Sequence, residues 1–379
     1  MTALGLVSAK GSPRERGLLQ GRDGKDRVSH MVAALAALPL AARPIPKPLL
    51  RGALSAIGES YLTLHRGLLR RHRRGRYLEA LEGLACGLGV RPGTVYGFNA
   101  FEIESANLSF RLGCTALAIP SALSRAGRPW LAYNHDFPPS FAPFLLVRRG
   151  TGPDVRQSLT LTYPMLVGAV AGVNDAGLAM TVNQAFATDL SRARPALLST
   201  LLLQTCLDEC ASVGEAVAVL RRTPCATGAL FTLVDAAGER AVAEVSATHV
   251  AVRREPEDRV LSAFNKYRLP ELVAVEVPVG AVTTGLGAGY DVHSVNVERE
   301  ARWPEIEPHA ALDREGIRRL LADHGREGPS MNTICCHGDA MNWTIASAII
   351  DPVARTLDVG RGPACEEHAS SHALEGAAA

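Results

Sequence analysis

The chain has 379 residues, of which 47% are hydrophobic, so it is long enough to bury a sizeable core. A formal net charge of +2 and an aromatic content of 5% argue against a nucleic-acid partner. The N-terminus does not join a basic start to an apolar run, and no uninterrupted apolar stretch reaches about 18 residues. We therefore expect no signal peptide, no membrane partner and a cytoplasmic protein with reduced thiols.

The first 113 residues carry apolar side chains at helical spacing. This pattern predicts helices over residues 14–23, 28–42, 48–73, 76–88 and 93–106. After Gly113 the pattern changes to short apolar runs between turn residues. These runs predict strands over residues 115–120, 129–134, 144–149, 158–164, 166–173 and 177–184.

Helices and strands then follow in separate groups. Two helices are predicted over residues 196–208 and 212–221, and another over 313–323. Strands are predicted over residues 229–234, 240–246, 248–253, 343–350 and 355–360, with a hairpin turn at 235–238. Clustered strands joined by hairpins favour an α+β class with antiparallel sheets and packed helical layers.

This pattern divides the chain into three parts. Residues 1–113 form a helical N-terminal segment, residues 114–365 a catalytic core of sheets and helices, and residues 366–379 a disordered tail of small and polar side chains. The eight cysteines fit neither paired Cys-x-x-Cys motifs nor a Cys/His zinc set, so we expect no metal site.

One cysteine lies at the change from helical to strand pattern. Cys114 follows Gly113 and opens a predicted strand, and the polar run 133–137 ends the strand expected to pair with it. Antiparallel pairing would bring Asp136 close to Cys114, where a carboxylate could hold an amine or orient a proton acceptor. From the residues alone, a buried core cysteine and a surface Asx turn remain open as alternatives.

Several motifs, taken in order, resemble the acyl-coenzyme A:6-aminopenicillanate acyltransferase family of the N-terminal nucleophile hydrolases. They lie at residues 11–17, 20–21, 77–83, 87–90, 113–115, 134–137, 174–178, 228–231, 244, 265, 323–324, 344–351 and 360–365. The resemblance implies a four-layer αββα sandwich of antiparallel sheets. It also implies self-cleavage between Gly113 and Cys114.

The resemblance also implies roles at matching positions. Cys114 is similar to the family's nucleophile, Asp136 to the carboxylate that positions the freed amine, and Asn265 to an oxyanion-hole donor. Asn183 resembles a second polar residue of such sites. Weaker expectations, of a structural or substrate-lining kind, fall on Asn134, His135 and Thr115.

The chemistry follows from the cleavage. A freed α-amino group has a reference pKa of about 7.7–8.0, so it suits a general base for the thiol of its own residue. Attack on an amide carbonyl would give a thioester that water or an amine resolves. We expect a small-molecule acyl amide or acyl donor as substrate and no metal or organic cofactor, with acyl-coenzyme A allowed as a donor. The N-terminal fragment should remain packed as a subunit, and a homo-oligomer remains open.

Two departures from the family pattern leave other functions open. The family often has histidine and arginine where this chain has Lys266 and Cys336. A cysteine peptidase that uses a separate base, such as His135 or His337, would need no self-cleavage. A non-catalytic binding module on the same fold is the third alternative.

Overall fold

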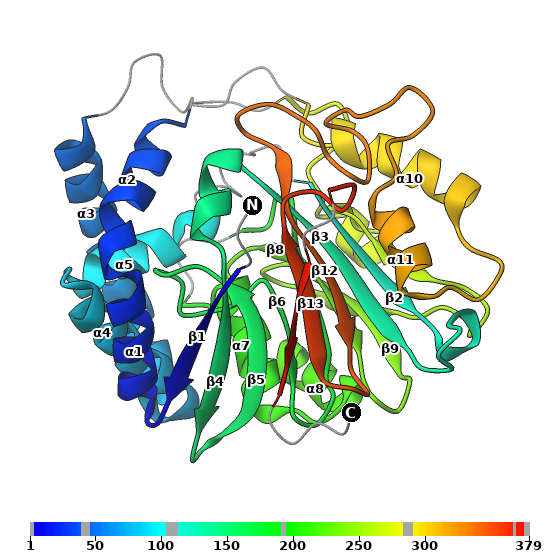
Figure 1. Ribbon diagram of the computed structural model, residues 1–379. Helices are drawn as coiled ribbons and strands as arrows, with labels where there is room; N and C mark the ends of the chain where they lie inside the picture. The colour runs from blue at the N-terminus through cyan, green and yellow to red at the C-terminus, as the bar shows by residue number, and fades with distance from the viewer. Residues whose placement is uncertain are drawn as a thin grey trace.

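Two β-sheets stacked face to face form the centre of the protein, and helices cover their outer faces (Figure 1). The computed structural model describes residues 4–38, 46–103, 113–190, 195–282, 291–366 and 369–374. The arrangement is the four-layer αββα sandwich of the α+β class that the family resemblance implies. Within the described ranges, no helix is both long and apolar enough to span a bilayer.

The N-terminal segment stands beside the sandwich as a group of helices (Figure 1). Its elements are β1 (Gly5–Lys10), α1 (Pro13–Gly24), α2 (Val28–Ala36), α3 (Lys47–Arg71), α4 (Arg76–Leu88) and α5 (Pro92–Asn99). Helix α1 packs closely on α4 because both present glycine at the contact. A Cβ added at Gly17 would lie 2.1 Å from the carbonyl oxygen of Ala80, and one at Gly83 would lie 2.0 Å from that of Arg14.

Residues 5–10 correct the expectation of a purely helical N-terminal segment. They form β1, which pairs in parallel with residues 146–151 and buries Val7 and Ala9. The strand was missed because only two of its side chains face the core and its partner lies far along the chain. The N-terminal segment therefore supplies an edge strand of the sandwich.

The larger sheet has the strand order β1-β4-β5-β6-β7-β8-β9-β10. Its further strands are β4 (Leu146–Gly152), β5 (Val155–Thr162), β6 (Ala171–Asn174), β7 (Ala179–Ala185), β8 (Gly228–Val234), β9 (Arg240–Val245) and β10 (Val250–Arg253). All pairings except β1–β4 are antiparallel. The helices α7 (Ser199–Glu209) and α8 (Val213–Arg222) pack on its outer face.

The smaller sheet has the antiparallel order β11-β2-β3-β12-β13-β14. Its strands are β2 (Cys114–Ile119), β3 (Trp130–Phe137), β11 (Leu261–Ala263), β12 (Trp343–Asp351), β13 (Thr356–Arg361) and β14 (Ala369–Ala373). The outer layer consists of α10 (Ser294–Ile306) and α11 (Arg314–Leu321), while α9 (Pro270–Val273) is a short turn of helix. A separate apolar cluster between this sheet and its helices includes Trp130, Trp303 and Ile317.

Two elements differ from the sequence prediction. Residues 369–373 form β14, which pairs with β13, so the backbone of the expected disordered tail is hydrogen-bonded there. Helix α10 was not predicted, because three charged side chains among its first eight residues obscure its apolar face. The predicted helix ends at 39–42 and 104–106, and residues 375–379 of the tail, lie outside the described residues.

Candidate active site

Cys114 is the first residue of β2, and its Cα lies opposite that of His135 in β3. The side chain is buried at 5% exposure and lines a cavity at the end of the sandwich. The Tyr133 hydroxyl lies 3.6 Å from Sγ. Burial, helped by the charge of Asp136, raises the pKa of the Cys114 thiol to about 11. The thiol of the intact chain is therefore protonated near neutral pH and needs a proton acceptor before it can attack.

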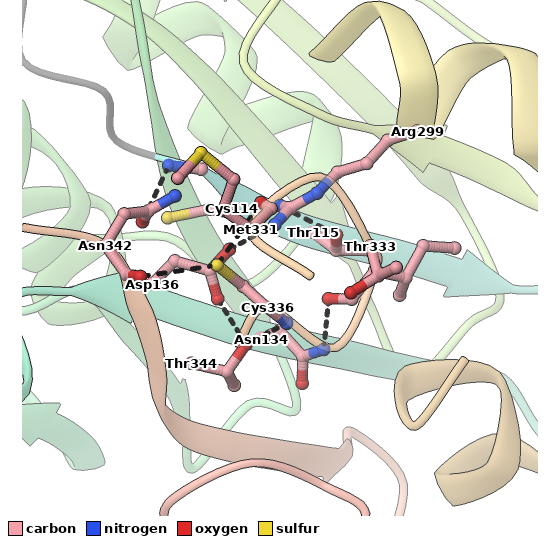
Figure 2. A network of polar contacts seen from close by, with 12 residues as sticks. Cys114, Thr115, Asn134, Asp136, Arg299, Met331, Thr333, Cys336, Asn342 and Thr344 are labelled. Carbon is pink, nitrogen blue, oxygen red and sulfur yellow. Dashed lines mark hydrogen bonds and ion pairs between the residues drawn. The ribbon is translucent and has the colours of Figure 1, made fainter. Parts of the chain in front are cut away.

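Asp136 lies on the opposite face of β3 from Tyr133 and His135, as alternation along a strand requires. Figure 2 shows its carboxylate between Arg299 and Thr344. Arg299 Nη2 donates to Oδ2 at 2.7 Å, and the Thr344 hydroxyl donates to Oδ1 at 2.6 Å. Both members of the Asp136–Arg299 ion pair are fully buried. Burial raises the pKa of the Asp136 carboxyl, and Arg299 and Thr344 oppose that rise.

Gly113 packs against this ion pair. A Cβ added at Gly113 would lie 2.9 Å from Arg299 Nη1 and 3.0 Å from Asp136 Oδ2. Its amide N–H donates to Asn342 Oδ1 at 3.4 Å. The close approach explains why the residue before Cys114 has no side chain.

The main-chain nitrogen of Cys114 is held by Asn265. That N–H donates to Asn265 Oδ1 at 2.6 Å, while Asn265 Nδ2 donates to the Gln184 carbonyl at 2.7 Å. Asn296 on α10 accepts the backbone N–H of Asn265 at 3.2 Å. In the intact chain Asn265 therefore acts as an acceptor toward Cys114, and its amide donor is engaged elsewhere.

Asn183 contacts the segment that leads to Asn265. Its Nδ2 lies 3.1 Å and 3.2 Å from the carbonyl oxygens of Ala263 and Phe264. It is buried but does not line the cavity at Cys114. Asn183 therefore lies behind the segment that carries Asn265, whereas the sequence prediction placed it in the wall of the site.

On the inner face, two tyrosines flank His135. The ring nitrogens of His135 lie 3.3 Å from the Tyr133 hydroxyl and 2.8 Å from the Tyr163 hydroxyl. Burial lowers the pKa of His135 to about 4, so the imidazole is neutral at physiological pH. Tyr133 separates His135 from the thiol, so the histidine does not contact Cys114 as the base of a cysteine peptidase would.

The cavity at Cys114 has a volume of about 110 Å³ and a largely apolar wall. Much of its wall is aromatic, from Phe98, Phe101, Phe137, Phe141 and Tyr163. The first two of these come from the N-terminal segment. Glu102, also from that segment, accepts hydrogen bonds from Ser199 and Thr200 at the start of α7, and burial raises its pKa to about 7.

The three weaker candidates have different positions. His135 lines the cavity, as expected of a substrate-lining residue. Asn134 faces the outer layer, where Nδ2 donates to the carbonyls of Leu321 and Ile334, which is a structural role. Thr115 also faces outward, and its hydroxyl accepts from Arg299 at 3.5 Å.

Sequence reasoning missed Arg299, Thr344 and Asn342. Helix α10 buries Val295, Asn296, Arg299 and Trp303. These residues are one to four positions apart and so lie on one face of the helix. An arginine on such a buried face was the sequence feature that could have revealed the site residue. Asn342 Nδ2 is buried and makes no hydrogen bond within the described part of the chain.

Both departures from the family pattern have a structural account. Lys266 forms an ion pair with Glu300 of α10 at 3.6 Å, with both side chains 23% exposed. Cys336 is fully buried, its Sγ lies 3.3 Å from the Met331 carbonyl, and its N–H donates to the Thr344 hydroxyl at 2.8 Å (Figure 2). Lys266 supports α10, whereas the backbone N–H of Cys336 supports Asp136 through Thr344 and its thiol fills a buried position beside the Met331 carbonyl.

Comparison with known proteins gives one family match. The family described as acyl-coenzyme A:6-aminopenicillanic acid acyl-transferase matches residues 124–362. That range includes Asp136, Asn183, Asn265 and Arg299 but begins after Cys114. No curated protein matches the sequence.

Three solved structures resemble the fold at low identity. A variant of conjugated bile acid hydrolase from Clostridium perfringens is 13% identical, over 69% of this chain and 92% of that chain, with a TM-score of 0.44. An N-acylethanolamine-hydrolyzing acid amidase ortholog from Caenorhabditis elegans is 13% identical over 63% and 93%, with a TM-score of 0.42. Penicillin V acylase from Agrobacterium tumefaciens is 17% identical over 65% and 82%, with a TM-score of 0.37.

Proposed function

Because the chain belongs to the acyl-coenzyme A:6-aminopenicillanic acid acyl-transferase family, we propose that it is a self-processing enzyme that hydrolyses or forms amide bonds, with Cys114 as nucleophile. One observation carries the proposal. The thiol of Cys114 lines an apolar cavity while the main-chain nitrogen of the same residue is held by Asn265 Oδ1 at 2.6 Å. After cleavage, that nitrogen would be the amine that serves the thiol.

Self-cleavage begins with attack of Cys114 Sγ on the carbonyl carbon of Gly113. The bond from that carbon to the Cys114 nitrogen breaks, the nitrogen takes the thiol proton, and a thioester remains. Water then hydrolyses the thioester, leaving a carboxylate on Gly113 and restoring the thiol beside a free amine. The packing of Gly113 against the Asp136–Arg299 pair would hold this carbonyl in one position relative to Sγ.

Turnover of substrate repeats the same chemistry. The free amine, with a reference pKa of about 7.7–8.0, takes the proton of the thiol as Sγ attacks an amide carbonyl. We assign Asn265, which already accepts from the Cys114 nitrogen, and Asp136 to hold the amine. The resulting thioester passes its acyl group to water, giving an acid, or to an amine, giving a new amide.

The oxyanion of each tetrahedral intermediate needs a donor. The family resemblance implies Asn265 for this role, and its Nδ2 donates to the Gln184 carbonyl in the intact chain. The side-chain amide has two N–H donors, so the second N–H of Asn265 is left to serve the oxyanion. Asn342 is the second candidate, because its buried Nδ2 has no hydrogen-bond partner within the described ranges and its Oδ1 already binds Gly113.

The cavity suggests the acyl part of the substrate. Its wall is mostly aromatic and aliphatic, with few polar groups. We therefore propose an aryl or aliphatic acyl group next to the scissile carbonyl, from either an amide or an acyl-coenzyme A donor. Since Phe98, Phe101 and Glu102 line the same cavity, the N-terminal fragment must stay bound after cleavage for this pocket to persist.

Intact mass spectrometry of the purified protein tests the proposal. We expect two fragments that divide after Gly113, and N-terminal sequencing of the larger should begin at Cys114 with Cys-Thr-Ala-Leu. Both fragments should elute together under native conditions. An active wild-type protein that remains one chain would overturn self-cleavage and favour a peptidase with a separate base.

A further inference from the structure

Four side chains outside the active site bring their potential ligand atoms together. They are His324, Cys335, His337 and Cys365, and these atoms all lie within 4.8 Å of one another. The four come from three segments: the turn after α11, the loop before β12 and the loop after β13. Within the described ranges, no other group of three or more histidine, cysteine and acidic side chains gathers in this way.

We propose that this cluster is a structural zinc site with a Cys₂His₂ ligand set. Zinc binds thiolate at about 2.3 Å and imidazole at about 2.0–2.1 Å in tetrahedral geometry. In such a tetrahedron the two sulfurs lie about 3.8 Å apart, the two nitrogens about 3.4 Å, and each sulfur–nitrogen pair about 3.6 Å. These edge lengths can be compared directly with the distances in the protein.

Four of the six edges agree with that tetrahedron, and the other two, from His324 to the sulfurs, are no longer than 4.8 Å. The sulfurs of Cys335 and Cys365 lie 3.7 Å apart. Nε2 of His337 lies 3.5 Å from the first sulfur and 3.4 Å from the second. Nε2 of His324 lies 3.2 Å from Nε2 of His337.

The chemistry of the donors favours zinc over other ions. Two thiolates and two neutral imidazoles suit Zn²⁺, whereas Mg²⁺ and Ca²⁺ prefer oxygen ligands. A sulfur separation of 3.7 Å is far longer than the roughly 2.05 Å of a disulfide. With four protein ligands no coordination position remains for substrate, so the site would be structural.

Hydrogen bonds already hold the ligands in place. The Cys335 N–H donates to the Asp323 carbonyl at 3.0 Å, and the His337 N–H donates to the Ser330 carbonyl at 2.9 Å. The Trp343 ring packs edge-on against the His337 ring, with centroids 4.8 Å apart. Such outer contacts orient metal ligands. The cluster is thus a built arrangement of three segments.

The site lies next to the support of the nucleophile. Cys336 follows a ligand directly, and its N–H binds the Thr344 hydroxyl that donates to Asp136. Asn342, which binds the Gly113 N–H, ends the same loop. Zinc would therefore fix the loop that braces Asp136 and Gly113. This last step rests on the proposed function, but metal binding itself does not.

Metal analysis of the full-length protein tests the inference. We expect about one zinc ion per chain after purification without chelator, in wild type and in C114A alike. C335S and C365S should lose most of that zinc. C86S is the matched control, because Cys86 is exposed on α4, and this variant should keep its zinc.

A second measurement uses the wild-type protein and so tests the site even if the cysteine variants fail to fold. Replacing zinc by Co²⁺ in the wild-type protein should give the visible absorption of a tetrahedral ion with thiolate ligands. Three results would each overturn the site. They are a folded wild-type protein without zinc, an equal zinc content in C365S and wild type, and a Cys335–Cys365 disulfide in protein purified under reducing conditions. Zinc in a wild-type chain that never cleaves would support the site and overturn the proposed function instead.

Discussion

Cys114 and the pair Cys335–Cys365 place the same side chain in two different settings. The Cys114 sulfur has a tyrosine hydroxyl beside it, an apolar cavity in front and a buried ion pair behind. The other two sulfurs lie beside each other and beside the imidazoles of His324 and His337. The Cys114 thiol can therefore reach a carbonyl group in the cavity. The sulfur and nitrogen lone pairs of the other group can instead bind one metal ion.

The difference shows that neighbours decide what a cysteine does. In both places the deciding neighbours come from distant segments: Arg299 and Asn265 for Cys114, and His324 for the pair. Variants that change the surroundings of Cys114 but not those of Cys335 and Cys365 should separate catalysis from zinc binding.

Replacing the nucleophile should have the largest effect. C114A removes the only sulfur that lines the cavity within the described ranges, so it should abolish cleavage and turnover completely, while zinc content stays at the wild-type level. C114S, whose hydroxyl is the weaker nucleophile, should cleave slowly. Denaturing gels and metal analysis on the same samples measure both. Turnover by C114A would remove Cys114 from the mechanism.

Breaking the ion pair behind Cys114 should be the next largest effect. R299M leaves Asp136 buried without its charged partner, which typically costs about 3–5 kcal/mol of unfolding free energy. It should also slow cleavage, because Gly113 packs on that pair. Urea unfolding of the variant in the uncut C114A background gives the number.

An exposed ion pair supplies the control for that measurement. Arg125 and Asp313 lie 3.4 Å apart with side chains 69% and 49% exposed, so R125M should change stability little. If R299M and R125M unfolded at the same urea concentration, the Asp136–Arg299 pair would not support the site.

The neutral histidine on the inner face predicts a pH dependence. His135 has a pKa of about 4 when folded, against 6.5 for a free histidine, so the unfolded chain binds a proton first. Its contribution to stability is present above pH 6.5 and is lost as the pH falls toward 4, a total of roughly 3 kcal/mol. Urea unfolding of C114A at pH 7 and pH 4.5 should show the loss.

H135Q should lose less stability over the same pH interval, since glutamine does not titrate. The exposed His309 provides the matched control through H309Q. H135Q also separates the mechanisms, because substrate turnover should continue in it if the freed amine is the base. Complete loss of activity in folded H135Q would favour a cysteine peptidase.

Much of the fold was predictable from local pattern. The strands β2, β3, β7 and β12 and the helices α4, α7 and α11 carry short periodic runs bounded by turns, so their positions follow from the residues. Helix α10 and strand β14 were not predictable in this way. Helix α10 buries an arginine, and β14 owes its place to hydrogen bonds with β13 rather than to apolar side chains.

The site was predictable only in part. Hairpin pairing of β2 and β3 brought Asp136 near Cys114, as expected, because consecutive strands joined by a short turn pair antiparallel and the end of one meets the start of the other. Arg299 and Asn342 required packing between distant segments, which no spacing rule reports. The same limit applies to the cysteines: His324, Cys335, His337 and Cys365 match no zinc spacing along the chain, yet they meet in space.

The smallest effect should come from Lys266, which stands where the family often has histidine. Its ammonium group pairs with Glu300 at the surface of α10 and does not line the cavity. Since both side chains are 23% exposed, K266M should cost less than about 1 kcal/mol of unfolding free energy. Cleavage and zinc content should both be unchanged, as gels and metal analysis can measure. A large loss of cleavage in K266M would mean that the ion pair on α10 affects Cys114 through Asn265 and Asn296. This face of α10 would then belong to the surroundings that determine the reactivity of Cys114.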